Sequence, residues 1–182
     1  MQENFGLVQV FFGNGKGKTT AALGTALRAL GRGHSVHLIQ FMKGGISTNK
    51  DFEEYGELLA LKKFENFSFE RFGFKEWVVG KPKPEHLKEA QKALTSAKRI
   101  VSNKKFDLVI IDECLYAIQL GVISENDIID LIKSKSKNTE LILTGSHKPL
   151  EKIFELADLV SEVKKIKHPY DKGIIARKGI EY

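Results

Sequence analysis

The stretch that decides the fold is a segment rich in glycine and lysine, Gly13-Asn14-Gly15-Lys16-Gly17-Lys18-Thr19-Thr20. An apolar run, residues 7–12, precedes it, and a run rich in alanine and leucine, residues 21–27, follows it. The first run is typical of a buried strand and the second of a helix. A strand, a glycine-rich turn and a helix that opens on Lys-Thr follow one another in this order in phosphate-binding loops. The stretch therefore predicts a phosphate site between a strand and a helix.

Each part of this stretch has a use in binding phosphate. Glycines let the backbone fold closely around an anion, so that several N–H groups point inward, and the helix N-terminus adds its positive dipole end. Lys18 can reach a phosphate, and the Thr19 hydroxyl is suited to Mg²⁺. Lys16 is an additional cation inside the loop. We expect residues 13–20 to bind a nucleoside triphosphate, with Lys18 on a phosphate and Thr19 as a metal ligand.

The loop departs from the common phosphate-loop signature by one residue. That signature places four residues between its first glycine and the Gly-Lys pair. Counting back from Gly17 puts the first glycine at position 12, which is Phe12, whereas the glycine of this chain is Gly13. A solvated turn rich in glycine and lysine is the alternative interpretation. The order of strand, loop, Lys-Thr and helix favours the phosphate loop, in a shortened form.

A second strong signal is an aliphatic run, residues 108–111, that is followed directly by Asp112 and Glu113. A continuous aliphatic run is typical of a central parallel strand that is buried on both faces. Such a strand delivers the two carboxylates to the carboxyl edge of the sheet, where ligands bind in open α/β folds. Beside a phosphate loop these carboxylates are candidate Mg²⁺ ligands, directly or through water. The alternative is that they only form a turn.

Strands and helices alternate along the whole sequence. We expect further strands at 36–41, 67–69, 141–145 and 159–163, and helices at 18–30, 85–102, 125–134 and 149–157. Residues 46–63 are polar and indicate a short helix or a loop. Alternation of this kind predicts one α/β domain over residues 1–182, with a mostly parallel central sheet and helices on both faces.

Two other features lie near the expected ligand edge. Lys43 follows the second strand, so it is either an anion contact or an ordinary solvated lysine. Phe72, Phe74 and Trp77 surround a break in the pattern at Gly73. Aromatic side chains on an irregular segment can form a wall for a large flat ligand, and they can equally be core residues.

Composition narrows the class of protein. The chain has 182 residues, a formal net charge of +6 and one cysteine, Cys114, so no internal disulfide can form. The charge suits an anionic substrate and is compatible with nucleic acid. No secretory leader is recognised and no apolar run approaches the ~18 residues of a membrane span, so we expect a cytoplasmic protein without a membrane anchor.

Seven blocks of the sequence together resemble the ATP:corrinoid adenosyltransferases of the CobA/BtuR type. The blocks are GNGKGKTTAALGTALRALG at 13–31, QFMKG at 40–44, GF at 73–74, VIIDECLYA at 109–117, LTG at 143–145, ADLVSEV at 157–163 and KHPYDKGIIARKGIEY at 167–182. The shortened loop is the form found in this family. The last block is distinctive, because generic nucleoside triphosphatases have no counterpart.

The resemblance implies a RecA-like P-loop NTPase fold and a particular reaction. A corrinoid in the Co(I) state attacks the 5′ carbon of ATP, which lies in the loop in a reversed sense, and triphosphate leaves. Mg²⁺, with Mn²⁺ as an alternative, would bind Thr19, Asp112 and Glu113. ATP would contact residues 13–20 and Lys43, and Lys16 and Lys18 would be the catalytic cations that neutralise the leaving triphosphate. The resemblance further implies a homodimer, a flavin-type reductase or flavodoxin as electron donor, and neither nucleic acid nor membrane as a partner.

The family uses aromatic residues to exclude the axial ligand of cobalt, which makes reduction to Co(I) easier. Phe74 matches the family phenylalanine that follows glycine, whereas Trp77 lies one residue later than the family tryptophan. Ser146 and His147 stand where the family often has Arg-Gly. The few residues before the first strand predict a short or absent N-terminal lid. The alternatives are a RecA-like Mg-ATPase and a small-molecule kinase, both of which would release ADP.

Overall fold

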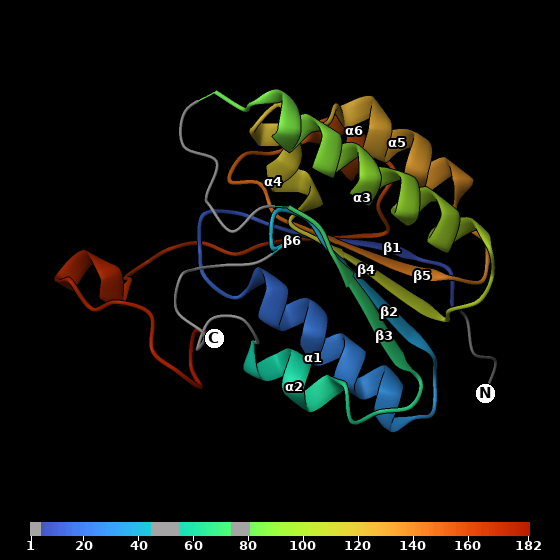
Figure 1. Ribbon diagram of the computed structural model, residues 1–182, viewed down its shortest axis with the longest axis horizontal. Helices are drawn as coiled ribbons and strands as arrows, with labels where there is room; N and C mark the ends of the chain where they lie inside the picture. Colours follow the sequence, from blue (N-terminus) through green and yellow to red (C-terminus); the bar gives the residue numbers. More distant parts are fainter. Residues whose placement is uncertain (1–4, 45–54, 74–80) are drawn as a thin grey trace.

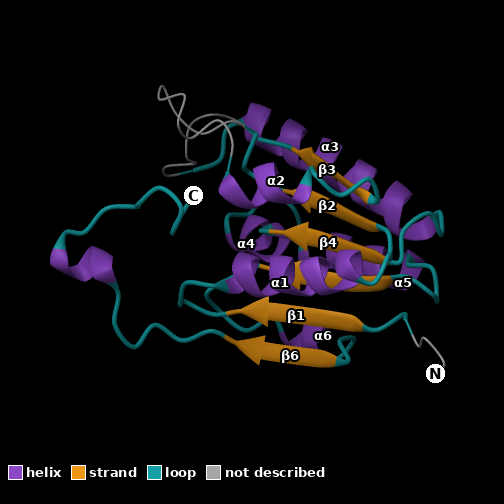
Figure 2. Cartoon of the chain, turned by 90° about the horizontal axis from the view of Figure 1, so that it is seen from below, coloured by secondary structure: helices purple, strands orange, loops and turns teal. Residues whose placement is uncertain are grey.

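The computed structural model describes residues 5–44, 55–73 and 81–182. Its centre is a six-stranded sheet in which every paired strand is parallel, with the order β3-β2-β4-β5-β1-β6. Figure 2 shows the six strands side by side and pointing the same way. The strands are β1 (Val8–Phe12), β2 (Val36–Gln40), β3 (Phe67–Arg71), β4 (Leu108–Asp112), β5 (Glu140–Thr144) and β6 (Leu159–Glu162). This arrangement confirms the α/β fold expected from the sequence.

Helices cover both faces of the sheet (Figure 1). One face carries α1 (Lys18–Gly31) and α2 (Gly56–Leu61), and the other carries α3 (Pro84–Ser102), α4 (Cys114–Gln119), α5 (Glu125–Ser134) and α6 (Glu151–Phe154). Each layer of helices buries its own apolar core against the sheet. The central strands β2, β4 and β5 are buried throughout. Burial on both faces explains why their sequences are aliphatic runs without polar alternation.

Local sequence explains several element boundaries. At the start of α5, the Ser124 hydroxyl accepts a hydrogen bond from the backbone N–H of Asp127, and the Asp127 carboxylate accepts from the N–H of Ser124. This reciprocal pair satisfies amides that the first turn of a helix leaves without partners. At α3, Pro84 occupies the first turn, where its missing N–H costs nothing.

Two elements differ from expectation. Helix α6 has four residues, Glu151–Phe154, where nine were expected, because the chain turns at once to join the sheet through a 2.8 Å hydrogen bond from Asp158 N to Val8 O. Helix α4 has six residues and is separated from the end of β4 by one residue, and it was not predicted from the sequence. Residues 55–61, in the stretch that was expected to hold a short helix or a loop, include α2.

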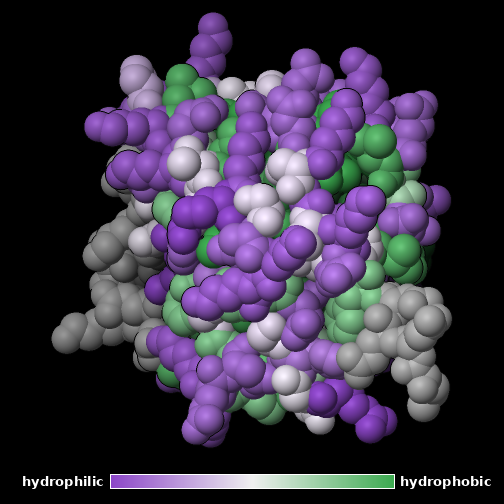
Figure 3. All heavy atoms as spheres, turned by 90° about the vertical axis from the view of Figure 1, so that its right-hand side faces the viewer, coloured by the Kyte–Doolittle hydropathy of each residue, from purple (hydrophilic) through white to green (hydrophobic). Residues whose placement is uncertain are grey.

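The two ends of the strands differ in character. The face at the amino ends of the strands is covered largely by hydrophilic side chains (Figure 3). At the carboxyl ends, the C-terminal segment (residues 163–182) projects beyond the sheet and then returns toward α1 and α2 (Figure 1). Among the residues that the structure describes, no helix combines the length and the apolarity needed to cross a membrane.

Candidate functional site

The phosphate loop connects β1 to α1 and depends on glycine at two backbone positions. Gly13 has φ 112° and Gly17 has φ 120°, a region that side chains disfavour. At Gly13, a Cβ atom would lie 2.4 Å from the carbonyl oxygen of Val163. Glycine is therefore required there both by the backbone angle and by the close approach of a neighbouring strand.

Neighbouring segments hold the loop in shape. Gly13 N donates to Ser146 O at 2.9 Å, and Gly15 N donates to Val163 O at 2.7 Å. The side chain of Asn14 points to the same neighbour, since its Oδ1 accepts from Lys165 N at 2.9 Å. These groups serve the architecture of the loop. The amides at the start of α1 have no acceptor within the helix, so they are the ones suited to an anion.

The two loop lysines have different partners. Lys18 lies across the loop, where its Nζ donates to Gly13 O at 2.7 Å and to Gly15 O at 2.9 Å. Burial lowers the pKa of Lys18, and the carboxylates at the end of β4 oppose that effect. Lys16 Nζ lies 3.8 Å from a carboxylate oxygen of Glu181, in the C-terminal segment. The loop therefore carries two cations, one bound to loop carbonyls and one beside the C-terminal segment.

Asp112 joins four elements at the carboxyl edge of the sheet. Its Oδ1 accepts from the hydroxyls of Thr19 at 2.8 Å and Thr144 at 2.6 Å. Its Oδ2 accepts from Gln40 Nε2 at 3.0 Å and Lys43 Nζ at 2.7 Å. Burial alone would raise the pKa of Asp112, but Lys43 and the hydrogen bonds outweigh it and hold that pKa below its ordinary value. Asp112 is therefore ionised, and it orients the hydroxyl of Thr19.

Lys43, which was expected either to contact an anion or to be solvated, is neither free nor in bulk solvent. Its side chain is 18% exposed and pairs with Asp112. Burial opposes the charge of Lys43, yet Asp112 and Glu113 raise its pKa above the ordinary value. The ammonium therefore stays protonated beside the loop, where its charge also acts on any anion bound there.

Three strands end at this edge in a left-handed residue that is not glycine. Met42, Glu113 and Ser146 have φ values of 56°, 62° and 52°. Such conformations cost about 1–3 kcal/mol each and are concentrated at functional sites. These conformations could not be predicted from the sequence, because methionine, glutamate and serine do not favour a positive φ.

Glu113 follows Asp112 but is placed differently. Its carboxylate accepts no hydrogen bond from any residue in the described ranges. Burial, and the neighbouring charge of Asp112, raise the pKa of Glu113. A carboxylate of this kind, with cations close by and oxygens still unbonded, is suited to a ligand or a metal ion.

The oxygens at this edge fit Mg²⁺, which prefers hard oxygen ligands and keeps several waters or phosphate oxygens. Thr19 and Glu113 supply a hydroxyl and a carboxylate, and Asp112 holds the hydroxyl in place. In the part of the chain that the structure describes, no group of three or more His, Cys, Asp or Glu side chains could bind a metal ion unaided. A metal ion here would take water or phosphate oxygens as its remaining ligands.

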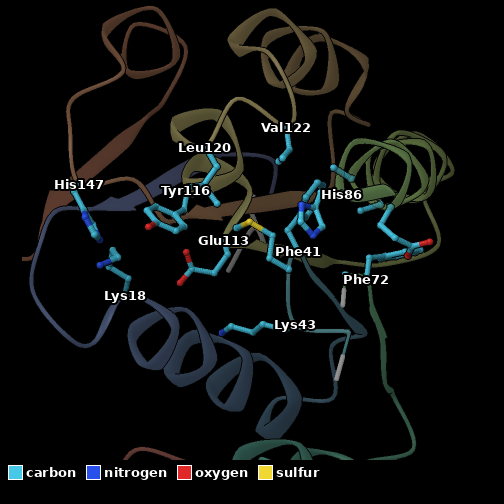
Figure 4. A pocket seen from close by; sticks show the side chains of 15 residues that line it. Lys18, Phe41, Lys43, Phe72, His86, Glu113, Tyr116, Leu120, Val122 and His147 are labelled. Carbon is cyan, nitrogen blue, oxygen red and sulfur yellow. The ribbon is translucent and has the colours of Figure 1, made fainter. Parts of the chain in front are cut away.

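Two pockets meet at this edge. The loop pocket, of about 590 Å³, lies between the phosphate loop, α1, α2 and the end of the C-terminal segment. The apolar pocket, of about 270 Å³, lies on the side of α3 and α4, and much of its wall is apolar, from Phe41, Met42, Phe72, Ala90, Leu120 and Val122. Lys18, Lys43 and Glu113 line both pockets. Figure 4 shows these three side chains between the phosphate-loop helix and the aromatic and aliphatic wall.

Tyr116 and His147 are site residues that sequence reasoning missed. Their rings lie 5.1 Å apart and line the apolar pocket near Lys18 (Figure 4). Burial, with a contribution from Lys18, lowers the pKa of His147. The only signal in the sequence was the departure at Ser146 and His147 from the family pattern. Gln40 and Thr144 were also missed, although both, like Tyr116, lie in sequence blocks that resemble the family.

Phe74 and Trp77, the expected corrinoid contacts, lie outside the described residues. The residues directly before them do border the apolar pocket, since Phe72 and Gly73 are part of its wall. Gly73 has φ 116°, and a Cβ atom on it would lie 2.6 Å from Met42 Cα. The chain after β3 therefore passes tightly against the chain after β2 at the mouth of this pocket.

A parallel α/β sheet with a phosphate loop after β1 and a buried aspartate at the end of β4 defines a P-loop nucleotide-binding class of protein. Within that class, the model of the family ATP:corrinoid adenosyltransferase BtuR/CobO/CobP matches residues 4–182, and the chain belongs to this family.

Curated relatives agree with this assignment over nearly their full lengths. A corrinoid adenosyltransferase of Escherichia coli (strain K12) is 32% identical over 185 residues, which cover the whole of this chain and 88% of the relative. The corrinoid adenosyltransferase CobA of Salmonella typhimurium (strain LT2) is 35% identical over 190 residues, with the same coverage. A corrinoid adenosyltransferase of Pseudomonas aeruginosa is 29% identical over 180 residues, which cover 97% of this chain and 84% of the relative.

Proposed function

We propose that this protein transfers the 5′-deoxyadenosyl group of ATP to the Co(I) of a corrinoid and releases triphosphate. The observation that carries the proposal is the meeting of the two pockets at Lys18, Lys43 and Glu113. A triphosphate in the loop pocket would leave the nucleoside end of ATP at this junction, next to the apolar pocket. That is where a nucleophile has to reach C5′.

The loop pocket would stabilise the leaving group. Lys18, Lys16 and the amides of α1 offer positive charge where the negative charge of triphosphate grows as the bond breaks. When bound, Mg²⁺ or Mn²⁺ would neutralise part of that charge, held by Thr19 and Glu113 together with phosphate oxygens. Asp112 would orient Thr19 through the hydrogen bond that it already accepts.

The reaction needs no proton transfer from the protein. The electron pair of Co(I) forms the Co–C5′ bond, the C5′–O bond breaks, and its electron pair leaves with triphosphate, so cobalt ends formally as Co(III). The side chains available agree with this scheme. Cys114 is fully buried and burial raises the pKa of its thiol far above the ordinary value, which makes it unsuitable as a nucleophile. Alignment and charge stabilisation are then the main contributions of the protein.

The apolar pocket would receive part of the corrinoid, with Phe72 in its wall. The proposal keeps Phe74 and Trp77, which lie outside the described residues, as corrinoid contacts. Apolar side chains that exclude water from cobalt favour the electron-rich Co(I) state. The proposal includes a flavin-type reductase or flavodoxin as the electron source and a cytoplasmic homodimer. The exposed edge strand β6, with Leu159 and Val160 at 42% and 39% exposure, supports association of two copies.

The experiment is an anaerobic assay with ATP, Mg²⁺ and a chemically reduced corrinoid, in which the light-sensitive Co–C bond is followed by absorbance. We expect product only when ATP, Co(I) and the protein are all present. Photolysis should return the starting corrinoid spectrum. ATP turnover that is unaffected when the corrinoid is omitted would contradict the proposal and favour an ATPase.

A further inference from the structure

The C-terminal segment contacts the phosphate loop at both of its ends. Where it leaves β6, Val163 O accepts from Gly15 N and Lys165 N donates to Asn14 Oδ1. Where it ends, Glu181 lies 3.8 Å from Lys16 Nζ, and residues 179–182 form part of the wall of the loop pocket. The segment between these ends is largely exposed. Its return to the loop is therefore a specific contact in an otherwise solvated stretch.

Glu181 is held in place by Arg177. The guanidinium donates to Glu181 from Nε at 3.2 Å and from a terminal nitrogen at 3.1 Å, and the backbone N of Arg177 donates at 2.8 Å. The hydrogen bonds from Arg177 hold the pKa of Glu181 at about 2. Glu181 is 19% exposed, whereas Lys16 is 43% exposed. An ionised carboxylate that Arg177 holds in place therefore faces the more exposed Lys16 at the rim of the phosphate site.

We propose that Glu181 is a positioning residue that competes with triphosphate for Lys16. This inference rests on the proposed function, because it assumes that the loop pocket binds a triphosphate. A polyphosphate product would be held strongly by Lys16, Lys18 and Lys43 together. A carboxylate that offers Lys16 another partner weakens that hold, so it favours the departure of triphosphate after transfer.

A purely structural role for the contact predicts the opposite change in triphosphate affinity when Glu181 is replaced. If Glu181 only anchored the C-terminal segment, its loss would loosen one wall of the loop pocket and weaken binding. If Glu181 competes for Lys16, its loss frees a cation and strengthens binding. The direction of the change therefore separates the two roles without knowledge of the structure of the variant.

The test uses inorganic tripolyphosphate with Mg²⁺ and measures its dissociation constant by calorimetry. We expect Glu181→Gln to lower that constant by about two- to fivefold, the size of an exposed ion pair. Glu162→Gln is the matched control, because Glu162 also pairs with a lysine, Lys164 at 3.2 Å, but does not line the loop pocket. It removes the same charge and should leave the constant unchanged.

The dependence on Lys16 completes the test. In a Lys16→Ala background, Glu181→Gln should have no effect on tripolyphosphate binding, and in steady state Glu181→Gln alone should lower both KM for ATP and kcat. Weaker binding in Glu181→Gln, or the same tightening with and without Lys16, would overturn the inference. A wild-type protein that binds neither tripolyphosphate nor ATP would overturn the proposed function itself. A dissociation constant for tripolyphosphate that is the same in Glu181→Gln and in the wild type would overturn this inference alone.

Discussion

At the scale of single residues, Asp112 has the largest structural role in the site. It is fully buried, and its carboxylate accepts hydrogen bonds from side chains of α1, β2 and β5. It also accepts one from Lys43, with which it forms an ion pair. Removing one partner of a buried ion pair leaves the other charge uncompensated. The residue therefore links the stability of the sheet edge to the placement of Thr19.

We expect Asp112→Asn to destabilise the protein by about 3 kcal/mol, because Lys43 would remain buried without its counter-charge. Activity should fall as well, since Thr19 loses a charged acceptor. Urea unfolding measures the first effect and the adenosylation assay the second. Asp130→Asn, on the exposed side of α5, is the control and should change neither. An unchanged unfolding midpoint for Asp112→Asn would show that the carboxylate is not needed to hold Lys43.

Lys18→Ala should lower activity without lowering stability. Its ammonium donates to the loop carbonyls of Gly13 and Gly15, so its loss removes charge from the phosphate site and little packing. We expect kcat to fall by ~10²–10³, the usual effect of removing one group that stabilises developing charge. The unfolding midpoint should stay close to that of the wild type. Lys133→Ala, on α5, is the control. Near-normal turnover of Lys18→Ala at saturating ATP would mean that the loop does not bind the leaving group.

At the scale of elements, the phosphate loop takes its shape from the strand end beside it. We expect Gly15→Ala to distort the loop, because the new Cβ would lie 2.8 Å from Val163 O, a backbone atom that cannot turn away. ATP affinity should fall at least about tenfold, while circular dichroism stays unchanged. Gly31→Ala is the matched control, since a Cβ there meets nothing within 4 Å. Equal ATP affinity in both variants would refute the role of this contact.

The pairing of β2 with β3 contains a group that responds to acid. His37 is 4% exposed, and its Nδ1 lies 2.7 Å from Ser68 Oγ. Burial lowers the pKa of His37 to about 4, an effect that Glu70 opposes. The folded protein therefore prefers the neutral ring, whereas the unfolded chain binds a proton below pH ~6.5. Stability contributed by the neutral ring should be lost as the pH falls from about 6.5 toward 4.

We expect this loss to reach about 3 kcal/mol at pH 4. His37→Gln should remove most of it, so the free energy of unfolding of the variant should fall less steeply between pH 7 and pH 4. His168→Gln, in the C-terminal segment, should keep the slope of the wild type. Identical slopes for His37→Gln and the wild type would assign the acid sensitivity to other groups.

The elements that sequence patterns predicted are those with local causes. The strand of residues 108–112 could be predicted because five consecutive buried positions require an apolar run, and the phosphate loop because its glycines and lysines are adjacent in sequence. The hydrogen bond between Gly15 and Val163, and the contact between Lys16 and Glu181, join residues 148 and 165 positions apart in the sequence. No local pattern encodes such contacts. For the same reason the positive φ at Ser146 and the place of His147 in the wall of the apolar pocket became evident only in three dimensions.

At the scale of the whole molecule, the sheet brings a polar site and an apolar site to one edge. The loop pocket lies on the side of α1 and α2, and the apolar pocket lies on the side of α3 and α4. Because the strands are parallel, their carboxyl ends meet where the two pockets join. An enzyme that breaks a bond at the nucleoside end of ATP needs this arrangement, whereas a phosphoryl-transfer enzyme needs its second substrate at the terminal phosphate.

The identity of the phosphate product tests this claim most directly. The protein should be incubated with ATP, Mg²⁺ and excess Co(I) corrinoid under anaerobic conditions, and the products separated and identified by phosphorus NMR. We predict one equivalent of tripolyphosphate for each Co–C bond formed, with no ADP. Stoichiometric ADP, or orthophosphate that appears without any alkylated corrinoid, would contradict the account.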